Sequence, residues 1–154
     1  MSDFRIVIDT REQEPWGFTC VTLRRALPAG DYSVDGLEDI VAVERKSLAD
    51  FTRTVVHEFP RFAAELEQLA KLPHACVVVE ADLDRVLRGE SAGVLRGAAP
   101  QSVLGAAVHI QVFFGVPVIW SGSRQAACAF ADAFLRMVAR EAAADRTTVE
   151  ARHA

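Results

Sequence analysis

The sequence has few cysteines and almost no lysine, and each scarcity argues against a class of protein. Its three cysteines, Cys20, Cys76 and Cys128, are far apart, and no CxxC or paired His–Cys spacing occurs. A disulfide scaffold or a zinc finger is therefore not expected. Only Lys46 and Lys71 among the 17 basic residues are lysine, and the net charge is −4. This balance excludes a generally basic, histone-like binder of nucleic acid but leaves room for a local basic site.

The sequence also lacks glycine motifs for nucleotide binding and an apolar N-terminal leader. Neither G-x-G-x-x-G nor G-x-x-x-x-G-K-[ST] occurs, so nothing supports a nucleotide-binding fold. The N-terminal residues carry charges where a signal peptide has its apolar stretch, so we expect a cytoplasmic protein with no membrane span. The uncharged stretch 102–119 approaches the length of a span, but Gly115 and Pro117 interrupt it. We expect it to form buried core or a subunit interface.

The composition, with 51% hydrophobic and 25% charged residues in 154, predicts one globular domain. We place this domain at residues 1–142, followed by a polar, fraying tail at 143–154. Apolar runs predict strands at 4–9, 20–24, 31–34, 40–44, 76–79 and 116–120. Helical spacing predicts helices at 48–55, 61–72, 83–87, 101–114 and 124–142. The Gly/Ala-rich segment 89–100 is expected to be a mobile loop.

The order of these elements predicts an α/β fold. A block of strands comes first, and helices then alternate with strands, which is typical of a mixed β-sheet flanked by helices on both faces. The dipeptide Asp35-Gly36 predicts a hairpin that lays the strand after Asp31 beside the strand that ends at Glu44. Ser47 is expected to cap the next helix, with an acidic residue three positions later.

Charged side chains converge in this hairpin. Because side chains alternate along a strand, Glu44 and Lys46 should point to one face and Arg45 to the other. The hairpin then brings the carboxylates of Asp31 and Glu44 together with the Lys46 ammonium. Oxygen ligands suit Mg²⁺, which activates water and offsets phosphate charge, so the set favours metal-assisted phosphodiester hydrolysis. The alternative is ordinary, because E-x-K on a strand is common and neighbouring charges are often solvated pairs.

The spacing of these residues resembles the core of the PD-(D/E)XK nuclease superfamily. More specifically, Asp9-Thr10-Arg11-Glu12, Gly30-Asp31 and the run from Glu44 to Asp50 resemble the D-x-R-E, G-D and E-R-K-x-x-x-D elements of the XPF-family nuclease domain. The resemblance covers about residues 4–55. It implies a restriction-endonuclease-like core and a structure-specific DNA endonuclease that cuts flaps and forks in DNA repair or recombination.

The resemblance also implies roles for the acidic residues. Asp31 and Glu44 would be ligands of Mg²⁺, with Mn²⁺ as a possible substitute, and Glu12 would be a third acid near the metal. The carbonyl of Arg45 would complete the ligand set, and Asp9 would support it from outside.

The basic residues follow the same implication. Lys46 would serve the attacking water and the scissile phosphate, and Arg11 would hold a phosphate oxygen. Asp50 could pair with Arg45 or Arg53, and an Arg45–Asp50 pair would be structural support. The expected phosphate contacts of the DNA are Arg24, Arg25, Arg53 and Arg61.

How DNA is held is a separate question, since residues 1–61 carry 8 Lys/Arg against 11 Asp/Glu. Many members of the XPF family carry a helix-hairpin-helix module, for which this chain is too short. We therefore expect DNA to be held by the nuclease domain alone, by dimerisation, or through a DNA-gripping partner protein. The apolar segments 102–119 and 126–138 predict a homodimer.

Two rival interpretations remain. A non-catalytic DNA-binding or dimerisation scaffold would typically have lost one of the acids or the lysine, and all are intact here. A nuclease with a different DNA substrate would carry the same motif, which defines the hydrolysis and not the shape of the DNA. We expect Trp16 to plug its loop onto the core and His109 to lie in the core or an interface. The Ala/Arg-rich composition fits a GC-rich bacterial or phage genome.

Overall fold

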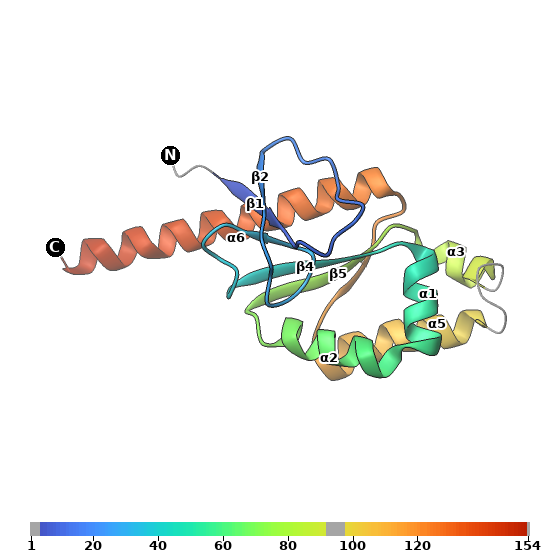
Figure 1. Ribbon diagram of the computed structural model, residues 1–154. Helices are drawn as coiled ribbons and strands as arrows, with labels where there is room; N and C mark the ends of the chain where they lie inside the picture. Colours follow the sequence, from blue (N-terminus) through green and yellow to red (C-terminus); the bar gives the residue numbers. More distant parts are fainter. Residues whose placement is uncertain (1–3, 92–97, 154) are drawn as a thin grey trace.

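The computed structural model describes residues 4–91 and 98–153 (Figure 1). The strands are β1 (Arg5–Ile8), β2 (Val21–Arg24), β3 (Tyr32–Val34), β4 (Val41–Lys46), β5 (His74–Val79) and β6 (Val118–Trp120). The helices are α1 (Leu48–His57), α2 (Phe59–Ala70), α3 (Leu83–Leu87), α5 (Pro100–His109) and α6 (Arg124–His153), and a π-helical turn, η1 (Ile110–Phe114), follows α5. Each predicted strand and helix is thus present, with boundaries that differ by a few residues except at the end of α6.

The strands form one mixed sheet in the order β2-β1-β3-β4-β5-β6. β1 and β2 are parallel, β4, β5 and β6 are parallel, and β3 runs antiparallel to both of its neighbours. The predicted hairpin of β3 and β4 is confirmed, and Gly36 takes a left-handed φ of 84° in its turn. The start of β3 therefore lies beside the end of β4, which brings two of the charged motifs together.

Helices cover both faces of the sheet, as the α/β prediction required. Alternate side chains of β4 and β5 enter different cores: Ala42 and Val77 lie in the core under α1, α2 and α5, whereas Val43 and Val78 lie in the core under α6. Figure 1 shows α6 on one side of the sheet and α1, α2 and α5 on the other. α6 contacts the sheet through four buried residues at helical spacing, Ala127, Ala131, Leu135 and Val138.

One prediction about a segment end is corrected, and the predicted break in the uncharged stretch is confirmed. The last helix continues through residues 143–153, which were expected to fray, and projects past the sheet (Figure 1). Its alanines at 142–144 favour helix, and no glycine or proline follows to stop it. The uncharged stretch 102–119 divides into α5, η1 and β6, with Gly115 ending η1 at a φ of 68°. No helix in the described residues is long and apolar enough to cross a membrane. The middle of the predicted loop, 92–97, lies outside the described residues.

Candidate active site

Asp31 is fixed at the junction of three strands. Its main-chain N–H donates to the carbonyl of Val43 over 2.9 Å, and its carbonyl accepts from the N–H of Asp9 over 2.8 Å. Its carboxylate oxygen Oδ2 accepts from the N–H of Arg45 over 2.7 Å. Gly30 precedes it with a φ of 71°, and a Cβ there would lie 3.0 Å from the carbonyl oxygen of Val43. Close backbone packing therefore requires glycine at position 30, and the residue that follows it supplies the carboxylate.

Asp31 and Glu44 line one cavity of about 430 Å³. The ammonium Nζ of Lys46 lies 3.5 Å from Glu44 Oε1 and 4.8 Å from the centroid of the Phe62 ring. The predicted convergence of two carboxylates and one ammonium is therefore present. The remaining lining includes charged and polar side chains from the first loop and from α2: Asp9, Arg11, Arg61, Glu65 and Gln68.

Burial makes both carboxylates costly to ionise. It raises the pKa of Asp31 to about 6, against the lowering effect of the hydrogen bond from the Arg45 N–H. Burial, followed by the negative charge of Asp31, also raises the pKa of Glu44 well above its usual value, while Lys46 acts in the opposite direction. Two carboxylates thus share one ammonium. A cation with oxygen ligands at this place would relieve the excess of negative charge.

Glu65 is a site residue that the sequence reading missed. It comes from α2, one helical turn after Arg61, and it lines the same cavity as Asp31 and Glu44. Its negative charge is felt by Glu44, where it also raises the pKa. The signal in the sequence is the i, i+4 spacing of Arg61 and Glu65, which places both on the face of α2 beside the buried residues.

A second cavity of about 250 Å³ lies next to the first. Arg61 and Glu65 line both cavities, and Lys46 and Arg53 line the second. Of the four arginines predicted to contact DNA, Arg61 therefore lines the cavity of Asp31 and Glu44, and Arg53 lines the adjoining one. Asp50 pairs with Arg53, Oδ1 to NH1 at 3.0 Å, and the predicted cap is confirmed by an Asp50 N–H bond to Ser47 Oγ of 3.0 Å.

Arg24 and Arg25 are the other two predicted DNA contacts, and neither lines these cavities. Arg24 donates to the carbonyl of Glu12, and Arg25 donates to Asp35 over 2.8 Å and to Glu38. Their charges are thus used, at least in part, to hold loops of the protein itself.

Glu12, the predicted third acid, is bound by Arg45. Its two carboxylate oxygens accept from Nε and NH2 of Arg45, over 3.0 and 3.1 Å, and it does not line the cavity of Asp31 and Glu44. The reason is the alternation of side chains on β4, which directs Arg45 away from Glu44 and Lys46 and toward the buried Glu12. A bidentate arginine satisfies a buried carboxylate that water cannot reach. Glu12 therefore holds Arg45, and its negative charge contributes to the raised pKa of Asp31.

Of the two partners predicted for Asp50, Arg53 is the one it contacts, and Arg45 lies elsewhere. Arg45 NH1 donates to Glu80 Oε1 over 2.5 Å, so its guanidinium lies between Glu12 and Glu80. Glu80 follows β5 and was not identified from the sequence. No group of three or more His, Cys, Asp or Glu side chains within residues 4–91 and 98–153 is arranged as a metal cage. The cavity is lined by the carboxylates of Asp9, Asp31, Glu44 and Glu65, and Asp9 is held by Arg11. Asp31 and Glu44 are the pair predicted to hold a cation there.

Asp9 and Arg11 form a fixed pair at the cavity wall. Asp9 Oδ2 accepts from the N–H and the Nε of Arg11, over 3.0 and 2.8 Å, and Oδ1 accepts from the N–H of Leu27 over 2.8 Å. Burial alone would raise the pKa of Asp9, but these hydrogen bonds hold it below its usual value. The carboxylate thus stays ionised and orients the Arg11 side chain, which is 76% exposed at the cavity.

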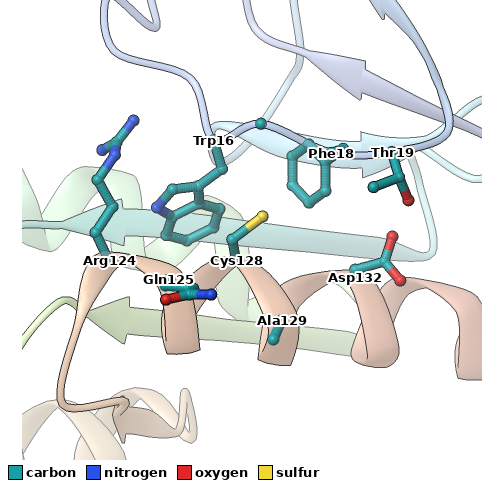
Figure 2. Close-up of a pocket in the computed structure, with 9 residues that line it drawn as sticks. Trp16, Phe18, Thr19, Arg124, Gln125, Cys128, Ala129 and Asp132 are labelled. Carbon is teal, nitrogen blue, oxygen red and sulfur yellow. The ribbon is translucent and has the colours of Figure 1, made fainter.

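A larger cavity, of about 560 Å³, lies between the loop at Trp16 and the start of α6 (Figure 2). Its one acidic lining residue, Asp132, accepts from Arg136 Nε over 2.7 Å, so it offers no pair of carboxylates. Trp16 is 3% exposed and stacks on Tyr32 with ring centroids 4.8 Å apart. It plugs its loop onto the core, as predicted. The chemistry of the site therefore lies on the other face of the sheet.

Comparison with known families places this fold. The family model described as the ERCC4 domain matches residues 8–134, which include every site residue named above. The chain belongs to the ERCC4 domain family. The predicted kinship with XPF-family nuclease domains is thereby confirmed.

Two solved structures share the fold of this ERCC4 domain. XPF from Aeropyrum pernix has a TM-score of 0.68 and 20% sequence identity, and the match covers 93% of this chain and 69% of that one. XPF from Aeropyrum pernix in complex with DNA gives a TM-score of 0.67 and 20% identity over 89% of this chain and 66% of that one. At 20% sequence identity, the similarity to these two structures establishes a shared fold.

A curated relative gives a different context. The protein of Methanocaldococcus jannaschii with the name "Putative ATP-dependent RNA helicase MJ1505" is 27% identical over 153 residues, which is 97% of this chain. The chain spans 17% of the length of that relative. The helicase in its name describes a much longer protein.

Proposed function

We propose that this ERCC4 domain is a metal-dependent endodeoxyribonuclease that hydrolyses phosphodiester bonds, with branched DNA such as flaps and forks as its substrate. The observation that carries the proposal is that Asp31 and Glu44 line one cavity while Lys46, which lines the adjoining cavity, lies with its Nζ 3.5 Å from Glu44 Oε1. Membership of the ERCC4 domain family and the intact D-x-R-E, G-D and E-R-K-x-x-x-D elements support it further.

The residues present fit a divalent cation. Asp31 and Glu44 offer carboxylate oxygens, which Mg²⁺ prefers, and Mn²⁺ can use the same ligands. Their shared burial leaves an excess of negative charge that a cation would offset. When bound, the ion would lower the pKa of a water molecule and offset charge on the phosphate.

The side chains around this pair have distinct tasks in the proposed reaction. Lys46 orients the attacking water and stabilises negative charge that develops on the phosphate. Arg11, oriented by Asp9, holds a phosphate oxygen at the wall of the cavity. Arg61 lies where the two cavities adjoin, so it can hold the same phosphate or the next one along the strand.

The DNA strand is proposed to follow the two cavities. Arg53 and Arg61 are the phosphate contacts that this path favours, and Arg24 and Arg25 have weaker support because they hold loops. The structural neighbour in complex with DNA is consistent with a DNA substrate. The preference for branched DNA rests on the resemblance to the XPF family.

A homodimer is proposed from an apolar patch on α5 and η1. Val108, Val112 and Phe113 are 53%, 68% and 75% exposed, and Phe113 stacks on His109 with ring centroids 4.4 Å apart. Three large apolar side chains on one exposed segment are typical of an interface. Val112→Asp should give a monomer mass by light scattering at a concentration where the wild type gives a dimer. A monomeric wild type would remove the homodimer and leave a separate DNA-gripping partner as the alternative.

The test of the activity is cleavage of end-labelled flap, fork, duplex and single-stranded DNA in Mg²⁺, Mn²⁺ or EDTA. Asp31→Asn and Lys46→Ala should abolish metal-dependent cutting of branched DNA. Glu90→Ala, which removes an exposed partner of Arg85, is the matched control and should cut normally. Equal cutting of all four DNA substrates would support the proposed active site but contradict the proposed preference for branched DNA.

The alternative function is a non-catalytic DNA-binding or dimerisation scaffold. The intact acid pair and lysine speak against it, because a scaffold has no need to keep two buried carboxylates beside one ammonium. A folded wild type that binds forked DNA with micromolar or better affinity, but cuts none of the four substrates in either metal, would establish the scaffold instead.

A further inference from the structure

Glu80 connects three segments of the chain from its position directly after β5. Its N–H donates to the carbonyl of Lys46 over 2.8 Å, and its carboxylate Oε1 accepts from Arg45 over 2.5 Å. The other oxygen, Oε2, accepts from Arg124 over 3.3 Å and lies 3.5 Å from Nε1 of Trp16. Figure 2 shows Trp16 and Arg124 side by side at the start of α6.

The link between Glu80 and Arg45 is a buried one. The side chains of Glu12, Arg45 and Glu80 are 5%, 10% and 8% exposed. Removal of one partner from such a group leaves a buried charge without compensation, which is strongly unfavourable. Glu14 also lies near Arg45, at 4.0 Å, but its side chain is 78% exposed and water can replace it. Glu12 and Glu80 therefore determine where the Arg45 side chain lies.

The position of Arg45 in turn determines the geometry of the candidate site. Glu44 and Lys46 flank it on β4, so fixing its side chain on one face directs both neighbours to the other face. Its N–H holds the carboxylate of Asp31 over 2.7 Å. A shift at the end of β4 would therefore move all three groups at once.

We propose that Glu80 is a positioning residue of the active site. It lies on the opposite face of the sheet and lines neither the cavity of Asp31 and Glu44 nor the adjoining one. It acts through Arg45, whose guanidinium it shares with Glu12, and through its own main-chain bond to Lys46. This inference rests on the proposed nuclease function and adds to it a residue that supports the acids from behind the sheet.

The test compares Glu80→Ala and Glu80→Gln with Glu14→Ala as the matched control, which removes the exposed acid near the same arginine. Mn²⁺ binding is measured without DNA from the electron paramagnetic resonance signal of free Mn²⁺, and cleavage of a fork is measured against Mn²⁺ and DNA concentration. Supporting residues of metal sites typically contribute about 10–100-fold in affinity or activity. We expect Glu80→Ala to weaken Mn²⁺ binding and lower kcat within that range, with KM for DNA within about twofold of wild type.

The readouts separate positioning from mere stability. Both readouts are taken on variants that circular dichroism shows to be fully folded without metal, because a partly folded variant would lose apparent Mn²⁺ affinity in proportion to its folded fraction. Glu80→Gln keeps the shape and one hydrogen-bond acceptor, so it should fold even where Glu80→Ala does not, and its loss should be smaller. Glu14→Ala should match the wild type in every measurement.

Failure of the positioning role can be distinguished from failure of the proposed nuclease function. If the wild type binds Mn²⁺ and cuts the fork while both folded Glu80 variants equal it, the positioning role is wrong and the nuclease function stands. If a variant raises only KM for DNA, Glu80 belongs to DNA binding and the positioning role is again wrong. If the folded wild type neither binds Mn²⁺ nor cuts DNA, the proposed function fails and this inference fails with it.

Discussion

The main-chain N–H of Arg45 donates a hydrogen bond of 2.7 Å to the carboxylate of Asp31. The two residues belong to different motifs, and the hairpin of β3 and β4 brings them together. One residue therefore serves two faces of the sheet: its N–H holds a site acid, and its guanidinium is held by Glu12 and Glu80 behind the site. The candidate site is built on a fixed strand end, which suits chemistry that needs its groups held before the substrate arrives.

The close packing at Gly30 predicts a loss of stability on substitution. Gly30→Ala forces a Cβ to 3.0 Å from the carbonyl of Val43 at a φ of 71° and should destabilise the fold by about 1–3 kcal/mol. The displaced Asp31 should also reduce DNA cleavage. Chemical denaturation with and without the substitution measures the first effect.

Two other glycines provide controls for this substitution. Gly36 has a φ of 84° but nothing within 4 Å of its Cβ position, so Gly36→Ala isolates the cost of the backbone conformation. Gly17 has open space as well and no left-handed φ, so Gly17→Ala should be near neutral. Equal losses of stability for Gly30→Ala and Gly36→Ala would contradict the prediction, because the close contact with the carbonyl of Val43 would then add no cost.

The cap of α1 predicts a smaller and purely structural effect. Ser47 Oγ accepts from the N–H of Asp50 over 3.0 Å, so Ser47→Ala should cost about 1 kcal/mol. Ser47→Asp keeps an acceptor at the same place and should retain most of the stability. Thermal and chemical unfolding measure both variants, and a loss for Ser47→Asp as large as for Ser47→Ala would contradict the capping role.

Local patterns predicted most of this fold because each rests on a short-range rule. The turn at Asp35-Gly36 fixed the pairing of β3 with β4, and the period of two along β4 correctly separated Glu44 and Lys46 from Arg45. Those two rules were enough to bring Asp31 and Glu44 to one cavity, with Lys46 beside Glu44. The patterns of apolar residues in β5 and α6 likewise predicted that helices cover both faces of the sheet.

Long-range partners could not be read in the same way. Glu12 and Glu80 are 33 and 35 residues from Arg45, and nothing in their neighbourhoods says that one arginine lies between them. Glu65 was missed because it follows Arg61 on a helix whose orientation the sequence leaves open. The extension of α6 was missed because polar composition was read as fraying, whereas helix propensity depends on the absence of glycine and proline.

Cys76 provides a test of burial that is independent of function. It pairs with Val43 in the sheet and is 1% exposed, and burial raises the pKa of its thiol to about 12. A raised thiol pKa means that the neutral form persists as the pH increases through 9, so the thiolate needed for reaction is absent at pH 8. A disulfide reagent at pH 8 should leave Cys76 unmodified in the folded protein and modify it in denaturant. Rapid labelling of Cys76 without denaturant, located by mass spectrometry, would contradict this packing.

Metal binding predicts a stabilisation that depends on the acid pair. A ligand at 100 times its Kd stabilises a folded protein by about 2.7 kcal/mol, which raises Tm by roughly 5–10 °C in a domain of this size. Mn²⁺ added to the wild type after EDTA treatment should give a shift of this order. Asp31→Asn and Glu44→Gln should lose it, because each removes one of the two carboxylates that are proposed to hold the ion at the cavity. Without metal at neutral pH, both variants should be at least as stable as the wild type, since the buried repulsion between the carboxylates is gone.

The control variant Glu90→Ala should keep the full shift in Tm on addition of Mn²⁺. A shift that is equal in all four proteins would mean that the ion binds elsewhere, and the acid pair would lose its proposed role.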